Sequence, residues 1–191
     1  MQQKVAIVGA GNVGKALREG LERTGYKVRA GGRGQVSETA AWADIIILAV
    51  PFAAIPDVTR EIQTAADGKT VVDVTNALTP DMQLALGFST SGAEELQKAL
   101  PRARVVKAFN TVFAQHMSRG SVVGQQLSLF AAGDDAAARK AVLELGKAIG
   151  FDAIDAGPLK NARHLEALGY FNIQLGYVLG HGPDIGFKLA H

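Results

Sequence analysis

A glycine-rich motif directly after a short apolar run constrains the fold of this chain more than any other feature. Residues 5–14 read VAIVGAGNVG, an apolar run that leads into the pattern G-x-G-x-x-G. The first glycine of such a motif permits a tight turn, the second permits close approach to a pyrophosphate, and the third permits close helix–strand packing. The apolar residues Val13, Leu17 and Leu21 then recur at the spacing of an amphipathic helix. The motif therefore predicts a strand, a turn and a helix that bind a dinucleotide.

The end of the predicted second strand, residues 27–30, lacks an acidic residue. GGRG follows at 31–34, and the first carboxylate after it is Glu38. NAD-binding proteins use Asp or Glu at this place to bind the ribose 2′-OH, whereas the guanidinium of Arg33 suits a 2′-phosphate. The sequence therefore favours NADP(H) over NAD(H), with Gly32 and Arg33 as contacts. The alternative is that Arg33 is a solvated turn residue.

Composition excludes several classes of protein. The 191 residues are 48% apolar and 20% charged, which suits one domain with a short extension. A net charge of +2 with dispersed basic residues argues against nucleic-acid binding, and no apolar run is long enough for a membrane span. Without cysteine, and with four histidines outside metal-ligand spacing, no metal site is expected. His116 and His191 are expected at the surface. The first strand begins too close to Met1 for a signal peptide, so we expect a soluble cytoplasmic protein.

Strand-like and helix-like segments alternate along the chain. Apolar runs at 4–8, 27–30, 45–50, 70–74, 104–108 and 127–132 predict strands, and the segments 12–24, 53–66, 92–100 and 135–150 predict helices. Ser91 and Glu94 have capping-box spacing at the start of the third helix. Asp134 or Asp135 can cap the fourth helix, and Gly150 can close it. The alternation is typical of an α/β protein with a Rossmann-type, doubly wound and mainly parallel sheet.

The segment after the second strand is too short for a complete mononucleotide-binding half. Residues 34–44 leave room for a short helix, predicted at 38–43. They do not leave room for a further strand with its own crossover, because a crossover takes a dozen or more residues. We therefore expect that this unit is missing and that the adenosine side of the site is open.

Residues 157–191 differ in character from the rest of the chain. Gly157 and Pro158 end the last α/β unit, and 159–179 reads as a long helix that is apolar on most sides, which predicts burial. We expect an NAD(P)-binding Rossmann domain at 1–156. The helical extension at 157–191 is expected to pack on that domain or on a second subunit; in the second alternative the protein is a homodimer. The end of the chain, from residue 181, reads as a loop.

Four further segments carry a family resemblance. They are RVVKAFNT at 104–111, GPLKNAR at 157–163 with Glu166 after it, AVPF at 49–52 and DVTN at 73–76. Together with the glycine motif they resemble the deazaflavin (coenzyme F-420)-dependent NADP reductase family of dinucleotide-binding oxidoreductases. They are also similar to the oxidoreductase domain of the six-transmembrane epithelial antigen metalloreductases. The resemblance covers nearly the whole chain.

The resemblance implies an enzyme that transfers hydride between NADP(H) and a flavin or deazaflavin, with a flavin or coenzyme F-420 as second substrate. In that family a Ser/Thr-Arg pair at the end of the second strand receives the 2′-phosphate. The pair falls here on Gly32 and Arg33, so only the arginine carries over. The shortened segment after Arg33 is a second departure from the family pattern.

The carboxyl ends of the strands are the predicted site, because ligands of open α/β sheets bind there. Phe52 is placed to lie against the nicotinamide or its ribose, and Asn76 can offer its amide to the carboxamide or to an acceptor ring. The predicted cofactor contacts are Gly9, Ala10, Gly11, Asn12, Val13, Gly14, Gly32, Arg33, Val50, Pro51, Phe52 and Asn76. The predicted acceptor contacts are Asn76, Phe109, Asn110 and Thr111. Each is also explained as a residue that ends a strand, since Asn and Thr favour turns.

No catalytic acid or base is assigned. Hydride transfer between a nicotinamide and a flavin requires stacked rings at the right distance rather than a general base. A carbonyl-reducing dehydrogenase would need a proton donor, for which Lys107 is the best candidate; the alternative is a packing lysine inside a strand. His164, with Arg163 and Glu166, either contacts an acceptor or forms a salt-bridged hinge between helix and sheet.

Three functions remain open at this point. The favoured one is an NADPH-dependent flavin or deazaflavin reductase whose partner is a small-molecule electron acceptor. The others are an NADPH dehydrogenase of a small carbonyl or imine, and a non-catalytic NADP(H)-binding sensor. The chain offers no second complete domain to close over a large substrate, which favours a shallow site and a flat ring acceptor.

Overall fold

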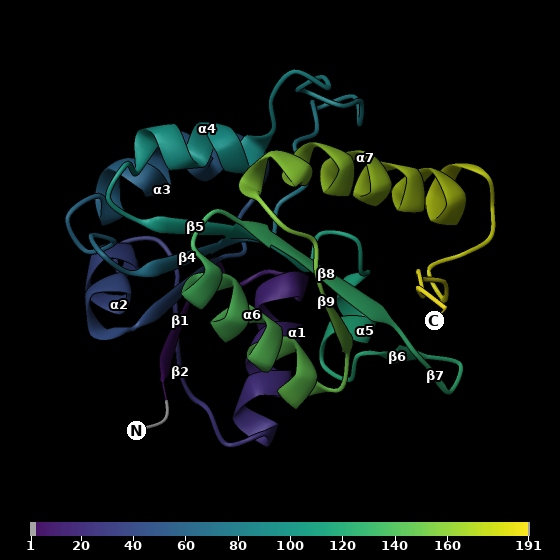
Figure 1. Ribbon diagram of the computed structural model, residues 1–191, viewed down its shortest axis with the longest axis horizontal. Helices are drawn as coiled ribbons and strands as arrows, with labels where there is room; N and C mark the ends of the chain where they lie inside the picture. The colour runs from purple at the N-terminus through teal and green to yellow at the C-terminus, as the bar shows by residue number, and fades with distance from the viewer. Residues whose placement is uncertain (1–2, 191) are drawn as a thin grey trace.

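The computed structural model describes residues 3–190, and its core is a seven-stranded sheet with helices on both faces (Figure 1). The strand order is β2-β1-β3-β4-β5-β8-β9. The strands are β1 (Lys4–Val8), β2 (Lys27–Gly31), β3 (Ile45–Leu48), β4 (Thr70–Asp73), β5 (Arg104–Lys107), β8 (Ser128–Gly133) and β9 (Asp152–Asp155). The first five pair in parallel, whereas β8 pairs with β5 in antiparallel and with β9 in parallel orientation. The predicted Rossmann-type, mainly parallel sheet is confirmed.

The helices form a layer on each face of this sheet. They are α1 (Asn12–Arg23), α2 (Val36–Trp42), α3 (Ile55–Ile62), α4 (Gly92–Ala99), α5 (Ala114–Met117), α6 (Ala136–Ile149) and α7 (Ala162–Ile173). In Figure 1, α4 and α7 lie above the sheet and α1 and α6 lie below it. Among residues 3–190, no helix combines the length and the apolar character that a bilayer crossing requires.

Strand β3 shows why the predicted strands read as continuous apolar runs. All four of its residues are buried. Ile45 and Ile47 belong to the hydrophobic core on the side of α1 and α6, whereas Ile46 and Leu48 belong to the core beneath α2, α3 and α4. Successive side chains of a strand point to opposite faces, so a strand covered on both faces must be apolar at every position.

The helix ends follow the predicted capping residues. Ser91 Oγ accepts a hydrogen bond from the Glu94 amide at 3.2 Å, and the Asp135 carboxylate accepts one from the Ala138 amide at 2.7 Å. Gly150 ends α6 with φ at 126°, in the region that favours glycine. Both predicted N-caps and the predicted C-cap are therefore confirmed.

Strand β2 lies at the edge of the sheet because the chain lacks the unit that would cover it. Its partner in the sheet is β1, and α2 leads directly from β2 into β3 on the far side of β1. The expected shortening after the second strand is thus confirmed.

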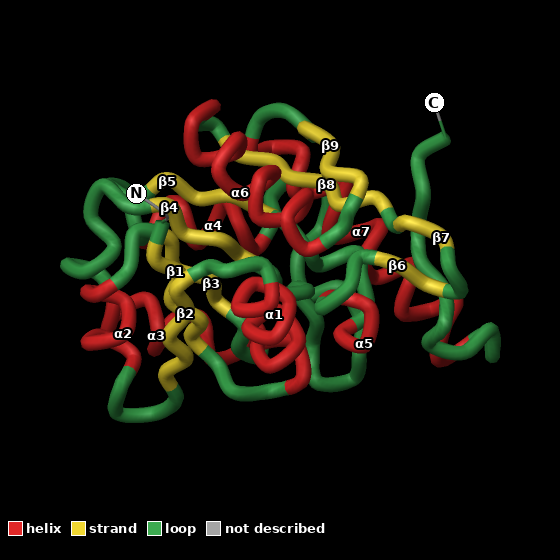
Figure 2. Tube along the Cα trace, turned by 90° about the horizontal axis from the view of Figure 1, so that it is seen from below, coloured by secondary structure: helices red, strands yellow, loops and turns green. Residues whose placement is uncertain are grey.

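Several short elements were not expected from the sequence. They are strand β9, the short helix α5, and a hairpin of β6 (Ser121–Val122) and β7 (Gln125–Gln126). Figure 2 shows this hairpin beside the main sheet rather than within it. These elements have two to four residues each, too few to show a periodic pattern.

The C-terminal helix departs from the expectation of burial on most sides. A 3₁₀ turn (Leu159–Asn161) precedes α7 and a π-helical turn (Gln174–Val178) follows it. Its buried positions near the end are small or polar, namely Gly169, Asn172 and Gly176. Large apolar side chains face outward instead: Phe171, Tyr177, Val178 and Leu179 are 50–65% exposed. The prediction that large apolar side chains form the buried face of this helix was wrong. The glycines form that face, because they let the helix approach the rest of the domain closely.

The residues after this helix return to the sheet without helix or strand structure. The Ser128 amide donates to the Phe187 carbonyl at 2.9 Å, and the Leu189 amide donates to Ser128 Oγ at 2.9 Å. The boundary at residue 156 and the homodimer expected from the C-terminal helix stay predictions. His191 lies outside the described residues.

We expect Gly14→Ala to lower the free energy of unfolding by about 1–3 kcal/mol, the usual cost of overpacking. A Cβ at this position would lie 2.2 Å from the carbonyl oxygen of Gly9, a backbone atom that cannot move aside. Gly11→Ala is the matched control, because a Cβ there meets no atom within 4 Å. Urea denaturation of both variants measures the difference, and equal losses would contradict this account of the loop.

Candidate functional site

A cavity of about 270 Å³ lies at the carboxyl ends of β1, β3 and β4, where the site was predicted. Gly11, Asn12 and Val13 line it from the glycine loop and the start of α1. The residues that follow β3 and β4 form the opposite side: Ala49, Val50, Pro51, Phe52, Val74, Thr75 and Asn76. Seven of the predicted cofactor contacts therefore meet in one cavity: Gly11, Asn12, Val13, Val50, Pro51, Phe52 and Asn76.

The glycine loop has the geometry of a phosphate cradle. Gly9 has φ at 120°, and a Cβ on it would lie 2.1 Å from the Ala49 carbonyl oxygen, so only glycine fits between β1 and β3. Gly11 faces open space, into which a side chain would project. Within residues 3–190, no side chain caps the N-terminus of α1, which leaves its first amides free for an anion. The loop thus fits the pyrophosphate of a dinucleotide.

Thr75 and Asn76 form a polar wall of the cavity. Thr75 is 5% exposed, and its Oγ1 has no hydrogen-bond partner among the described residues. The Asn76 amide nitrogen donates to the carbonyl oxygen of Asn110, and the Asn110 amide nitrogen donates to Asn76 Oδ1, both at 3.1 Å. A buried polar atom without a partner is uncommon, so Thr75 Oγ1 is a group that a ligand can satisfy.

The predicted acceptor contacts after β5 lie behind this wall. Phe109, Asn110 and Thr111 are 1%, 4% and 2% exposed and do not line the cavity. Phe109 has φ at 65°, and its ring packs edge-on against Phe151 with 6.0 Å between centroids. The structure therefore brings Asn76 to the cavity and places these three residues as its support. Ala10 is exposed, and Gly9 and Gly14 pack beneath the loop.

The tip of β2 lies beside the glycine loop, because the Gly9 amide donates to the Gly31 carbonyl at 3.1 Å. Arg33 follows as an exposed residue in the turn after β2, next to the half-buried Gly32. Neither residue lines the cavity at the strand ends or the cavity along the edge of β2. Their position next to the loop nevertheless agrees with a contact to the adenosine end of a dinucleotide.

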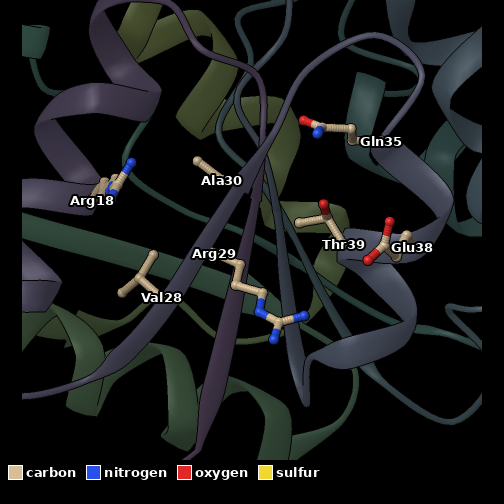
Figure 3. Close-up of a pocket in the computed structure, with 7 residues that line it drawn as sticks. All are labelled: Arg18, Val28, Arg29, Ala30, Gln35, Glu38 and Thr39. Atoms are coloured by element: carbon tan, nitrogen blue, oxygen red, sulfur yellow. The ribbon is translucent and has the colours of Figure 1, made fainter.

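A second cavity of about 370 Å³ lies along the open edge of β2 (Figure 3). Arg18 of α1 borders it on one side of the strand, and Gln35, Glu38 and Thr39 border it on the other. Arg29 projects from β2, and its guanidinium lies 4.5 Å from the ring centroid of Trp42. The cavity occupies the place at which a further strand would pair with β2, so the adenosine side is open as expected.

A buried ionic cluster of Lys107, Asp73 and Glu166 lies directly behind Thr75. Their exposures are 0%, 1% and 4%. The Lys107 ammonium group donates to Asp73 Oδ2 at 2.9 Å and to the Thr75 carbonyl at 2.6 Å, and it lies 3.0 Å from Glu166 Oε1. Burial acts to lower the pKa of Lys107, but the two carboxylates outweigh it and raise that pKa above its usual value. Of the two alternatives for Lys107, proton donor or packing lysine, the structure shows the packing lysine, which is held in its charged form.

Glu166 and Arg163 form ion pairs that join α7 to its neighbours. Glu166 also accepts hydrogen bonds from the Gly92 and Ala93 amides, at 3.0 and 3.3 Å, and so covers the N-terminus of α4. Arg163 makes a two-pronged contact with Glu94, with a shortest distance of 2.7 Å. His164 is exposed and takes no part. Of the two alternatives, acceptor contact or salt bridge, Arg163 and Glu166 thus form the salt bridges.

His116 is not the surface residue expected from the sequence. It is 9% exposed, and its Nε2 lies 3.0 Å from the Pro183 carbonyl oxygen. The prediction was wrong because the residues after the C-terminal helix fold back over α5, a contact that no local pattern announces.

Sequence reasoning missed the roles of Asp73 and Thr75, and it did not identify Lys107 and the N-terminus of α4 as the partners of Glu166. Asp73 and Thr75 stand in the segment DVTN, whose position at a strand end was the available signal. Asp73 Oδ1 accepts the Thr75 amide at 2.9 Å and so fixes the turn that leads into the cavity wall. Glu166 lies far away along the chain, and its partner could not be named before the fold was known.

The fold is that of a Rossmann-type domain, and this cavity lies where such domains bind a dinucleotide. Residues 33–77 match the model of the family described as "NADP oxidoreductase coenzyme F420-dependent". The chain is 31% identical to metalloreductase STEAP3 of Rattus norvegicus over 180 residues, which is 86% of this chain and 36% of the rat protein. The chain thus spans about a third of the length of the curated relatives it matches.

Two solved structures resemble the chain over its whole length. One is a protein of Arthrobacter sp. FB24 described as a candidate F420-dependent NADP reductase, with 29% identity, a TM-score of 0.91, and coverage of 99% of this chain and 100% of that one. The other is a hypothetical protein of Sinorhizobium meliloti, with 25% identity, a TM-score of 0.72, and coverage of 100% and 96%. These matches confirm the predicted resemblance to the coenzyme F-420-dependent NADP reductases and to the metalloreductases.

We expect Lys107→Met to lower the free energy of unfolding by about 3–5 kcal/mol, since it leaves two buried carboxylates without their cation. Glu166→Gln is expected to lower the free energy of unfolding less, by about 1–2 kcal/mol. It keeps the ion pair of Lys107 and Asp73, whose charges cancel, and loses one charge-assisted contact. Denaturant unfolding at pH 7 gives both values. A Glu166→Gln loss as large as that of Lys107→Met would contradict the charge balance described here.

Proposed function

We propose that this protein transfers hydride between NADP(H) and a flavin or deazaflavin acceptor. Bound NADPH supplies a hydride, which carries two electrons and one proton to the acceptor ring, and the oxidised dinucleotide remains. The chain's own residues bind the dinucleotide, hold the nicotinamide end against a wall and keep the opposite face open. The observation that carries the proposal is a cavity at the strand ends whose lining, within residues 3–190, consists of glycine and of apolar and uncharged polar side chains.

Binding of the dinucleotide is supported by the loop and by the edge of the sheet. The free amides at the start of α1 suit the pyrophosphate, and Gly11 leaves the space that it needs. Arg33 is the first cation after the tip of β2, and this tip lacks a carboxylate. A guanidinium there favours the 2′-phosphate of NADP(H).

The lining of the cavity supports a ring acceptor. Each lining residue lies in the described part of the chain, and none of them titrates. Phe52 and Pro51 provide flat apolar surface, and Thr75 and Asn76 provide hydrogen-bonding groups. Hydride transfer to a flavin-type ring depends on alignment of two rings, for which such a surface is sufficient.

The geometry weighs against the dehydrogenase alternative. Reduction of a carbonyl or imine would draw a proton from Lys107, the candidate named from the sequence. Lys107 is 0% exposed and its ammonium group already has three acceptors, so it does not reach the cavity. A proton transfer from it would first require the buried cluster to open.

We expect the protein to oxidise NADPH anaerobically with at least one of FMN, FAD, riboflavin or a deazaflavin. Absorbance of NADPH measures the rate with each acceptor in parallel. NADPH that binds but is not consumed with any of the four would contradict the proposed reaction and would favour the sensor alternative.

Arg33→Ala is expected to weaken NADPH binding roughly ten- to hundredfold and to leave NADH binding almost unchanged, because only NADPH carries the 2′-phosphate. Arg102→Ala is the control, since Arg102 precedes β5 and so lies at the opposite ends of the strands. Fluorescence titration with both nucleotides measures the dissociation constants. Equal effects of Arg33→Ala on NADPH and NADH would remove the 2′-phosphate assignment.

Gly11→Val is expected to abolish binding of NADPH and NADH alike. Its branched side chain would fill the space that the loop leaves for the pyrophosphate, although the protein itself has room for it. The same titration, with thermal unfolding as a check on folding, tests this. A folded Gly11→Val variant that still binds would show that the loop does not hold the phosphates.

A further inference from the structure

A third cavity, of about 370 Å³, forms a groove between α3 and α4, which lie side by side in Figure 1. Its surface is mostly apolar and comes from Ile55 and Pro56 of α3 and from Leu96 and Ala99 of α4. A volume in this range and a mainly apolar lining are typical of sites for small organic ligands.

The lining residues Thr59, Arg60 and Glu95 are already paired, and the remaining polar side chain, Gln63, is uncharged and exposed. Thr59 Oγ1 donates to the Ile55 carbonyl at 2.7 Å, and Arg60 forms an ion pair with Asp57. Glu95 accepts hydrogen bonds from Lys98 at 2.8 Å and from Thr90 at 2.6 Å. The groove therefore presents apolar surface between balanced charges, and the chemistry that it suits is a neutral, apolar ring system.

Phe52 connects this groove to the cofactor cavity, because its side chain lines both. The ring lies against Gly92 at the start of α4: a Cβ on Gly92 would be 3.0 Å from Phe52 Cε2. Glu166 holds the Gly92 amide at 3.0 Å, so the backbone under the ring is fixed. The Phe52 side chain thus lies between the groove and the cofactor cavity, and it packs against the hydrophobic core.

We propose that the groove between α3 and α4 is the second half of the acceptor site and holds the apolar outer ring of a flat tricyclic acceptor. The acceptor then lies across Phe52, with its reacting ring in the cofactor cavity. This inference rests on the proposed function and makes it more specific: the groove selects acceptors by their uncharged ring body, and Phe52 aligns that body with the nicotinamide.

The test is to fill the groove at its far end. Ala99 is exposed and lines the groove, so Ala99→Phe takes up its volume without disturbing the core. Ala137→Phe is the matched control, since Ala137 is an exposed alanine of α6 on the other face of the sheet. The probe is lumiflavin, which carries the tricyclic ring without a charged arm, and its fluorescence is titrated in the presence of NADP⁺.

We expect Ala99→Phe to weaken lumiflavin binding at least about tenfold, the loss of roughly 1.4 kcal/mol, whereas Ala137→Phe leaves it unchanged. NADPH affinity should stay the same in both variants. Ala53→Phe, at the end of the groove near Phe52, is the second variant and should have the same effect. Thermal unfolding confirms that each variant is folded.

Equal lumiflavin affinities in Ala99→Phe, Ala53→Phe and Ala137→Phe would overturn the groove assignment. An Ala99→Phe variant that reduces flavins with the same acceptor KM as the wild type would also overturn the groove assignment. That result would not contradict the proposed reaction. If lumiflavin binds in the groove but NADPH is not oxidised, the proposed reaction is contradicted and the groove assignment is supported.

Discussion

The ion cluster of Lys107, Asp73 and Glu166 is the interaction on which the rest of the site depends. It joins the ends of β4 and β5 to α7, and through Glu166 it also holds the N-terminus of α4. Three buried charges sum to one negative charge, which is costly without further compensation. The amides of Gly92 and Ala93 and the positive end of α4 supply that compensation. The cluster is therefore stable only when the sheet and both helices are in place together.

The cluster sets the shape of the cavity above it. Lys107 holds the Thr75 carbonyl and Asp73 holds the Thr75 amide, so the chain leaves β4 in one fixed direction. Asn76 comes next and is locked by its reciprocal hydrogen bonds with Asn110. Gly169 of α7 makes this pair possible, since a Cβ there would lie 2.4 Å from Asn76 Oδ1. The polar wall is thus held ready before any ligand binds, which is the condition for aligning two rings.

The part of the fold that local patterns determine could be predicted from the sequence. The glycine motif, the apolar runs and the capping residues gave the order of strands and helices, because each depends on residues close together in the chain. Strand β9 was missed because Asp152–Asp155 is short, bears an acidic residue at each end and is only half-buried. The helix after Pro158 was found, but the face that it buries depends on glycines whose partners lie elsewhere.

The site was predicted as far as position at a strand end can define it. Position placed Val50, Pro51, Phe52 and Asn76 correctly at the cavity. It could not show that Phe109 adopts a left-handed backbone and turns its ring into the core, because side-chain direction there depends on tertiary packing. Lys107 shows the same limit: its two carboxylate partners come from distant segments.

The central claim is that this cavity aligns a nicotinamide with a flat ring acceptor for direct hydride transfer. The measurement that tests it most directly uses NADPH deuterated on one or the other face of nicotinamide C4, with a deazaflavin as acceptor, under anaerobic conditions. Mass spectrometry of the reduced acceptor follows the label. The account predicts that deuterium from one face only appears in the reduced ring, since the wall of the cavity covers the other face. Oxidation of NADPH without deuterium in the acceptor, or transfer from both faces equally, would contradict it.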